Sequence, residues 1–403
     1  MMPSNAVACV RGVVSGDEFA PGAGFTVGGA GVVGAPVAAS GGRCAGGSAR
    51  RHGRRPGNGT RYAARMFATL AGAYPDADVR PEPVARERLL SILRDQLDAG
   101  LGMLSDGRVH DAVAEGAAIV DAWTAADEAV RQLVLEDGAG LEPPLVKVCV
   151  VGPYTLGRGA DGPGAAAGEV TGRSPSSGPS AAGPSARRRR RTLAAAEELN
   201  GVIGELFRAG APVVQVGEDA LAHLDAAADR ELALVRDALS RLTRDLDGHV
   251  SLAVSGGNAD RPGPALFFDP PFASYLFDLV AGPDNWRLIA VAPGDRGIIC
   301  GVADARSRTR DDRAVMVWAA RYAAALGGRG PQRVGLAPSA GLEILPRDVA
   351  RAKLAALAEA ARAAGLPDEE LKQVLDPRAV DMRSAALGRY DPSARPGRRR
   401  SGR

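Results

Sequence analysis

The stretch L-V-K-V-C-V-V-G, residues 145–152, is an apolar run interrupted by one charged residue. β-Branched residues dominate it, and such residues favour β-strands. Because the run is apolar throughout instead of alternating with polar residues, it predicts a strand that is buried on both faces. Strands of that kind belong to parallel sheets covered by helices.

The same pattern recurs along the chain at intervals that leave room for helices. Seven further runs predict strands: 67–74, 101–105, 212–216, 249–255, 274–280, 297–304 and 333–337. Helical periodicity fills most of the intervals, at 82–99, 109–123, 192–209, 219–245, 311–326 and 347–364. Eight strand–helix units predict an α/β fold, a single (β/α)₈ TIM barrel over residues 66–385, and a doubly wound open sheet is the alternative.

Three segments lie outside this rhythm. Residues 1–65 are rich in Gly, Ala and Arg and predict a disordered extension, either an organelle transit peptide or a tail without function. Residues 157–191 predict a disordered insert in a strand-to-helix loop, and residues 386–403 predict a basic disordered tail.

Composition narrows the class of protein. The hydrophobic content of 45% and charged content of 24% are ordinary for a soluble globular chain. The net charge of +3 comes from the run Arg187–Arg191 and from the C-terminal arginines, so it does not predict a nucleic-acid-binding surface. No uncharged stretch is apolar enough to predict a membrane span. The four cysteines, Cys9, Cys44, Cys149 and Cys300, have no C-x-x-C spacing, and we expect a reducing, cytoplasmic location unless residues 1–65 direct import.

Five motifs stand at the predicted strand ends. They are G-A-Y-P (72–75), Q-L-D-A-G-L (96–101) with D-G-R (106–108), V-G-P-Y-T-L (151–156), Q-V-G-E-D-A-L (215–221) and P-S-A-G-L (338–342). In this order they resemble the cobalamin-independent methionine synthase family, whose superfamily includes uroporphyrinogen decarboxylase. The segments D-L-V-A-G-P (278–283) and G-V-A-D-A-R (301–306) resemble the N-terminal barrel of that family, which lacks its zinc site.

The resemblance implies a zinc ion that activates homocysteine and a methylated folate that supplies the methyl group. The family's His-x-Cys pair falls here at Ala253 and Ser255, its second Cys at Ala340, and its Glu near Asp278. Because alanine cannot bind zinc and serine binds it poorly, we expect no zinc. An isolated His249 on the same strand is expected to be structural. The family's contacts to the homocysteine amino group fall at Gly217, Arg108 and Ala73, so we expect homocysteine not to bind.

Polar residues nevertheless remain at the predicted pocket, on the face where the strands end. The candidates are Asp106, Arg108, Tyr154, Gln215, Glu218, Ser255, Asn258, Asp278, Asp304 and Arg306. Each of them has a simpler interpretation, since polar residues at strand ends commonly bond to loop backbone.

Three functions stay open on the sequence. The first is a methyltransferase-like enzyme of the methionine synthase type with altered chemistry. The second is a binding or scaffold protein, a pseudoenzyme on a degenerate barrel that takes a small-molecule ligand at the C-terminal face. The third is a metal-independent enzyme resembling uroporphyrinogen decarboxylase.

Overall fold

The structure is a computed structural model, and it describes residues 66–75, 85–107, 110, 112–136, 142–159 and 184–375. These all lie in the second of two compact units, Met1–Pro56 and Gly57–Arg403. The predicted extension at 1–65 and the predicted tail at 386–403 fall outside the described residues, as do residues 160–183 of the predicted insert.

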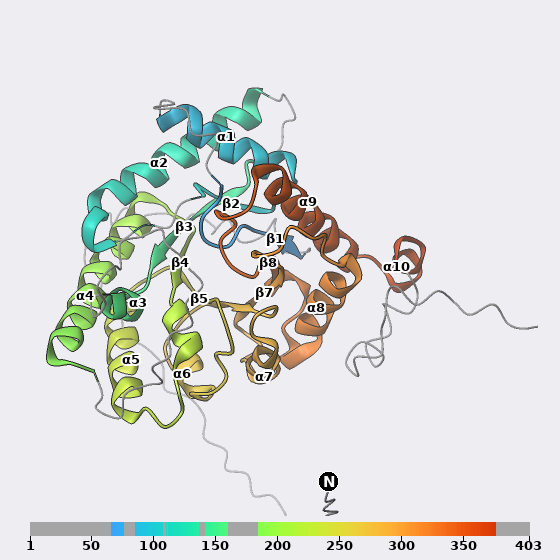
Figure 1. Cartoon of the computed structure of the whole chain (residues 1–403). Coiled ribbons are helices and arrows are strands. Elements are labelled where there is room, and N and C mark those ends of the chain that lie inside the picture. Colours follow the sequence, from blue (N-terminus) through green and yellow to red (C-terminus); the bar gives the residue numbers. More distant parts are fainter. Residues whose placement is uncertain are drawn as a thin grey trace, which may run out of the picture. The chain divides into compact units, whose positions relative to one another are not determined.

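Eight parallel strands form a closed barrel around which the helices are arranged (Figure 1). Neighbouring strands pair in the order β1-β8-β7-β6-β5-β4-β3-β2. The ring closes between β1 and β2, where Thr69 bridges to Met103 and Gly102 N donates to Ala68 O at 3.0 Å. This closure confirms the (β/α)₈ barrel and excludes the open sheet. The strands are β1 (Phe67–Ala68), β2 (Met103–Ser105), β3 (Leu145–Val151), β4 (Val213–Gly217), β5 (His249–Val254), β6 (Ser274–Asp278), β7 (Gly297–Ala303) and β8 (Val334–Pro338).

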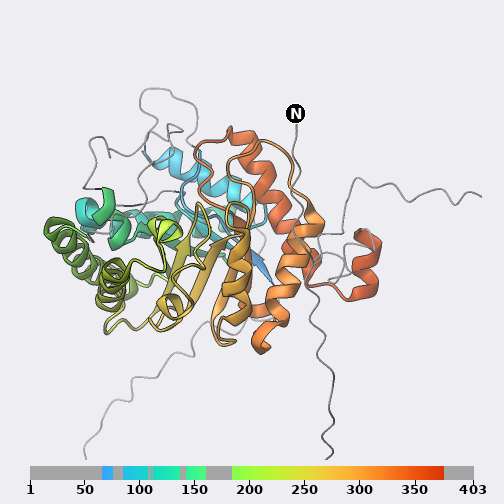
Figure 2. The ribbon, with the colours of Figure 1, turned by 60° about the horizontal axis from the view of Figure 1, so that its bottom comes forward.

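Helices run alongside the strands on the outside of the barrel (Figure 2). The α-helices are α1 (Ala85–Asp98), α2 (Ala112–Glu136), α3 (Pro153–Arg158), α4 (Ala186–Ala209), α5 (Asp229–Leu242), α6 (Ala265–Phe268), α7 (Trp286–Val291), α8 (Arg313–Ala325), α9 (Arg347–Ala364) and α10 (Asp368–Val374). Short 3₁₀ turns are η3 (Asp219–His223), η4 (Pro283–Asn285), η5 (Leu326–Gly328) and η6 (Pro331–Arg333). No helix of the described part of the chain is both long and apolar enough to cross a membrane.

Successive side chains of each strand point alternately toward the helices and into the barrel, so the core has two parts. Outward-facing residues such as Val148, Val214 and Leu252 pack beneath the helices in one large cluster. Inward-facing residues form a second, smaller cluster inside the barrel: Ala71, Ala253, Leu276, Ile299 and Ala337. Because three of these five are alanines, the barrel interior leaves space that side chains from other positions can enter.

Both ends of the expected insert and one expected helix are wrong. Gly157 and Arg158, assigned to the insert, belong to α3. Residues 186–191, also assigned to it, form the first turns of α4, which Ser185 caps by accepting a hydrogen bond from Arg188 N at 3.1 Å. The arginine run is ordered because Arg188 pairs with Glu231 of α5 and Arg189 lies 3.3 Å from Asp237 of the same helix. The single helix expected over 219–245 is broken into η3 and α5.

Two cysteines lie within the described residues. Cys149 and Cys300 are free thiols buried on β3 and β7, where burial raises the pKa of each.

Candidate functional site

The loops at the C-terminal ends of the strands are held together by carboxylates that accept hydrogen bonds from backbone N–H groups. Glu218, directly after β4, is fully buried and reaches the N-terminus of α3. Its Oε1 accepts from Tyr154 N at 2.9 Å, and its Oε2 accepts from Thr155 N at 2.8 Å and from Thr155 Oγ1 at 2.7 Å. Glu218 therefore caps a helix, as its simpler interpretation suggested, although the helix is the preceding one.

Glycine at position 152 makes that cap possible. A Cβ atom on Gly152 would lie 2.3 Å from the Glu218 carboxyl carbon, a distance that no side chain could occupy. Burial raises the pKa of Glu218 to about 7, against the hydrogen bonds from Thr155 and Tyr154 that favour the carboxylate.

Asp278, at the end of β6, serves the neighbouring loops in the same manner. Its Oδ1 accepts from Val280 N and Ala281 N, both at 2.9 Å, and its Oδ2 accepts from Gly256 N at 2.9 Å. Asp278 is fully buried. The side chain thus joins the loop after β5 to the loop after β6, and its oxygens are engaged.

Ser255 and Asn258 also bond within these loops. Ser255 N donates to Asp219 Oδ1 at 3.0 Å. Asn258 Nδ2 donates to Asp284 Oδ2, and Asn258 Oδ1 accepts from Asp284 N, both at 2.9 Å. Both residues lie at the face that the sequence predicted, and both hold loop geometry.

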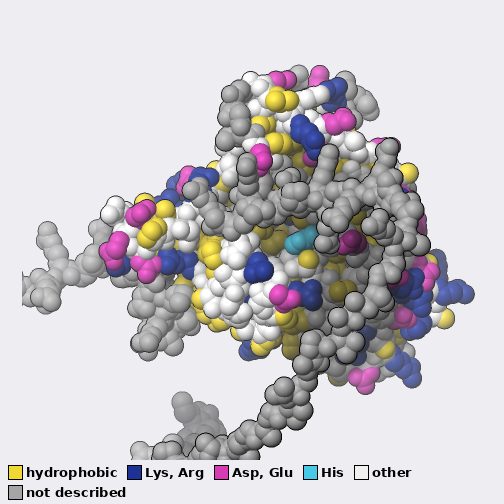
Figure 3. Space-filling model, turned by 180° about the vertical axis from the view of Figure 1, so that it is seen from behind, with side chains coloured by type: hydrophobic (Ala, Val, Ile, Leu, Met, Phe, Trp, Pro, Cys, Tyr) yellow, Lys and Arg dark blue, Asp and Glu magenta, His cyan; other side chains and the backbone are white. Residues whose placement is uncertain are grey.

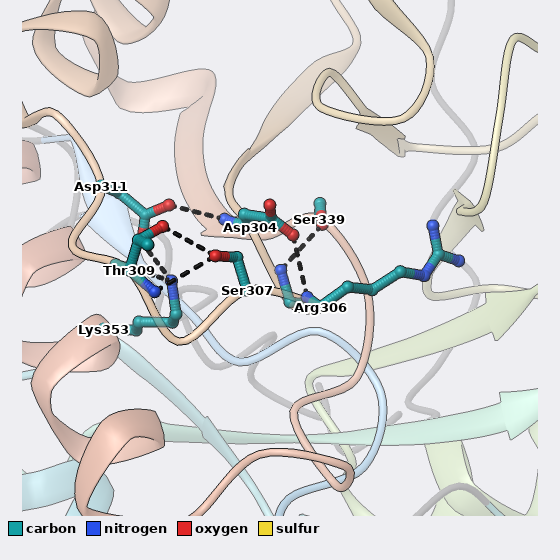
Figure 4. Close-up of polar contacts among 8 residues, drawn as sticks. Asp304, Arg306, Ser307, Thr309, Asp311, Ser339 and Lys353 are labelled. Atoms are coloured by element: carbon teal, nitrogen blue, oxygen red, sulfur yellow. Dashed lines mark hydrogen bonds and ion pairs between the residues drawn. The ribbon is translucent and has the colours of Figure 1, made fainter.

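Asp304 and Arg306 follow β7 in a loop that Figure 4 shows with its polar contacts. Asp304 Oδ1 accepts from Arg306 N at 2.9 Å, while Asp304 N donates to Asp311 Oδ1 at 2.8 Å. Lys353 of α9 anchors the loop by pairing with Asp311 at 2.7 Å. The Arg306 side chain extends away from this cluster in Figure 4, and its guanidinium has no hydrogen bond or ion pair with a described residue.

The guanidinium of Arg306 lies over the end of β5, since a Cβ atom on Gly256 would be 3.5 Å from its Nη2. It shares this region with residues that the sequence analysis did not select. Burial lowers the pKa of His223 in η3, and the positive charges of Arg158, Arg261 and Arg306 lower it further. All three arginines are exposed. We call Arg158, His223, Arg261 and Arg306 the basic cluster.

An acidic group stands at the same end of the barrel. Burial among protein atoms raises the pKa of Asp219, and the charges of Asp278 and Glu343 raise it further. Asp219 also has exposed surface. The C-terminal end therefore carries the exposed arginines Arg158, Arg261 and Arg306 together with carboxylates that include Asp219 and Glu343.

Two selected residues, Tyr154 and Gln215, point away from this region, Asp106 borders a separate cavity at the same end, and Arg108 lies outside the described residues. Tyr154 is fully buried and turned outward, with its hydroxyl donating to Glu231 Oε2 of α5 at 2.9 Å. Gln215 lies at the middle of β4 and lines a cavity near the strand starts, at the opposite end from the one predicted. Asp106, directly after β2, pairs with His110 at 2.7 Å and borders a cavity of about 650 Å³ at the C-terminal end, which α1, α2 and Glu343 of the loop after β8 also line.

The positions that the resemblance assigns to zinc do not suit a metal ion. Ala253 belongs to the apolar cluster inside the barrel, and Ala340 packs against the outer core. Asp278 is engaged by three backbone N–H groups. Among the described residues, no three His, Cys, Asp or Glu side chains are grouped so that they could hold a metal ion. The residues present do not fit the zinc of the resembled family.

Solved structures similar to this barrel include methyltransferases. A B12-independent methionine synthase from Shewanella sp. W3-18-1, in complex with selenomethionine, superposes with a TM-score of 0.52 at 16% identity, covering 77% of this chain and all of the other. A methyltransferase from Methanosarcina mazei gives 0.47 at 13% identity over 73% of this chain and 94% of its own. A homocysteine methyltransferase from Escherichia coli gives 0.40 at 14% identity, with coverage of 75% and 100%.

The likeness to the Shewanella protein supports the fold. No protein-family model matches the sequence, and no curated protein is significantly similar to it.

Proposed function

We propose that this chain is a divergent barrel protein of the methionine synthase type that binds a small anionic ligand at the C-terminal end, without zinc-dependent methyl transfer to homocysteine. The observation that carries the proposal is the basic cluster, in which Arg306 has no described partner for its guanidinium. Arginine guanidinium groups bind carboxylates and phosphates through paired hydrogen bonds. An exposed cluster of three arginines is therefore suited to an anion.

The acidic half of the same end restricts the ligand further. Asp219 and Glu343 provide acceptors at the same end of the barrel as the basic cluster, so a fitting ligand has hydrogen-bond donors as well as negative charge. A reduced folate has both features, because its pterin ring carries N–H donors and its glutamyl tail carries carboxylates. A methylated folate with several glutamates is the ligand class that we infer.

Binding is favoured over catalysis because the buried carboxylates are already engaged. Glu218 accepts three hydrogen bonds from the start of α3, and Asp278 accepts three from the loops after β5 and β6, so neither has a free oxygen to offer a reacting group. The position of the family's amino-group ligand is Gly217, which has no side chain to bind homocysteine.

Calorimetry with a polyglutamyl methylfolate, homocysteine and a tetrapyrrole tests the proposal. We expect the folate to bind and Arg306→Gln to weaken it about ten-fold, the loss of one charge-assisted hydrogen bond. Arg208→Gln, an exposed substitution on α4, is the matched control and should leave the affinity unchanged. Homocysteine binding, or methyl transfer to it, would contradict the proposal, and binding of the tetrapyrrole alone would favour the uroporphyrinogen decarboxylase-like alternative.

A further inference from the structure

Lysine is rare in this chain, and one lysine is placed unlike the others. The sequence contains Lys147, Lys353 and Lys372 among its 50 lysine and arginine residues. Lys353 pairs with Asp311 at 2.7 Å, and the exposed Lys372 pairs with Glu369 at 2.8 Å. Lys147 has no carboxylate partner among the described residues. A chain that otherwise uses arginine has therefore placed lysine in its interior, and lysine differs from arginine in that it can lose its proton.

Lys147 is the third residue of β3 and points into the barrel, where its exposed fraction is 1%. It lines a cavity of about 690 Å³ together with residues at the starts of the neighbouring strands, including Val213, His249 and Ser274. This is the N-terminal end of the barrel, opposite the basic cluster. Figure 3 shows the molecule from this side, with hydrophobic side chains around a central hollow.

The polar contacts of the cavity leave two groups incompletely bonded. Lys147 Nζ donates to Gln215 Oε1 at 2.7 Å. Ser251 Oγ, fully buried one strand further on, has no hydrogen-bond partner, although buried hydroxyls are usually bonded. His249 is occupied, since its Nε2 lies 2.8 Å from Ser274 Oγ.

The charges around the cavity do not stabilise an ammonium ion. The charged lining residues besides Lys147 are Asp295, Arg333 and Arg362, two of which are positive. Burial lowers the pKa of Lys147, and the Cys149 thiol is the ionisable neighbour that acts against this. A neutral amine donates one N–H to Gln215 and keeps a lone pair, which makes it a nucleophile.

We propose that Lys147 forms an imine with a small carbonyl compound that enters the barrel from its N-terminal end. The nitrogen lone pair attacks the carbonyl carbon, and the C=O π electrons move to the oxygen. The resulting carbinolamine loses that oxygen as water, together with the two protons that the amine nitrogen gives up, and a C=N bond remains. Ser251 Oγ is available to hydrogen-bond a ligand inside the cavity, and Arg333 and Arg362 favour a carbonyl compound that carries a carboxylate.

Reductive trapping with glyoxylate and cyanoborohydride at pH 7 tests this inference on the full chain. Reduction of the imine leaves a carboxymethyl group on the lysine, and peptide mass spectrometry compares the three lysines. We expect Lys147 to be modified at least about ten-fold faster than Lys372, whose exposed amine is protonated at this pH. Labelling in urea should remove the difference, because it abolishes the cavity.

Variants separate the amine from the cavity. Lys147→Met should lose the modification, and Lys372→Arg should leave that of Lys147 unchanged. Glycolaldehyde, which is similar in size but uncharged, should react more slowly than glyoxylate if the two arginines assist. If Lys147 stays unmodified in the folded chain, or reacts no faster than Lys372, the inference is wrong.

Discussion

The two ends of this barrel use their polar residues in opposite ways. At the C-terminal end, both oxygens of the buried carboxylates of Glu218 and Asp278 accept hydrogen bonds, and the exposed Arg306 guanidinium has no described partner. At the N-terminal end, the buried groups Lys147 and Ser251 are themselves incompletely bonded. Sites of this fold usually lie at the C-terminal end. The buried acids at the C-terminal end therefore stabilise the fold, whereas the buried polar groups that lack a full set of hydrogen bonds, Lys147 and Ser251, lie at the N-terminal end.

Removing Asp278 should give the largest effect on stability. Asp278→Ala leaves the N–H groups of Gly256, Val280 and Ala281 without their acceptor. An unsatisfied buried group costs about 1–3 kcal/mol, and partial rehydration reduces the sum, so we expect a loss of about 3–5 kcal/mol in the free energy of unfolding. Urea denaturation measures it. Asp278→Asn keeps one acceptor oxygen and should lose less; equal stability of wild type and Asp278→Ala would contradict a structural role.

Glu218 should make stability fall as the pH rises. Its pKa is about 7 in the folded chain against an ordinary value of 4.5, so the folded state binds more protons between these values. This stability is fully present below about pH 4.5 and is lost as the pH passes through 7, by about 3 kcal/mol in total. Unfolding free energies at pH 5 and pH 8 test the sign. Glu218→Gln cannot ionise, so its difference between the two pH values should be smaller by about that amount.

The alternation of apolar runs with helical segments was enough to predict the barrel. The expected helix at 347–364 coincides with α9, and each expected strand overlaps an observed one. β1 is shorter than expected, with two residues, because only its first part pairs with β8 before the chain turns into the G-A-Y-P loop. The hydrophobic pattern shows which residues are buried, and the order of buried strands and helices is what defines this fold.

The site was harder to predict because side-chain direction decides it. The strand-end rule found Asp304 and Arg306, and applied to the loops after β3 and β5 it would also have found Arg158 and Arg261. It could not show that Glu218 reaches back to the helix before it. Nor could it show that Gln215 lines the N-terminal cavity. An inward-pointing side chain reaches one end of the barrel or the other according to its position along the strand.

Lys147→Met should have a smaller effect, opposite in sign to that of Asp278→Ala. Replacing a buried amine that has one hydrogen bond by an apolar side chain of similar length removes a desolvation cost. We expect a gain of about 1 kcal/mol at pH 7, measured by urea denaturation. Because burial lowers the pKa of Lys147, the unfolded wild-type chain binds more protons than the folded one as the pH approaches the ordinary pKa of lysine, and the free energy of unfolding of the wild type rises with pH there. The stability advantage of the variant should therefore shrink as the pH rises. A loss of stability would place Lys147 among the structural groups.

The zinc experiment should give the smallest effect, and it tests whether the C-terminal end retains the chemistry of the resembled family. We expect elemental analysis of dialysed protein to find no stoichiometric zinc, and a chelator to leave the melting temperature unchanged. The reason is the set of side chains at these positions: Ala253 and Ala340 have no ligand atom, Ser255 is a poor ligand, and Asp278 is engaged by three N–H groups.

The triple variant Ala253→His, Ser255→Cys and Ala340→Cys sharpens the test by supplying the family's ligands at these positions. If the triple variant gains zinc while the wild type has none, the carried-over positions converge in space and only the ligand atoms were lost. About one zinc per wild-type chain would mean that other residues bind the metal, and the C-terminal end would then have a buried chemistry of its own.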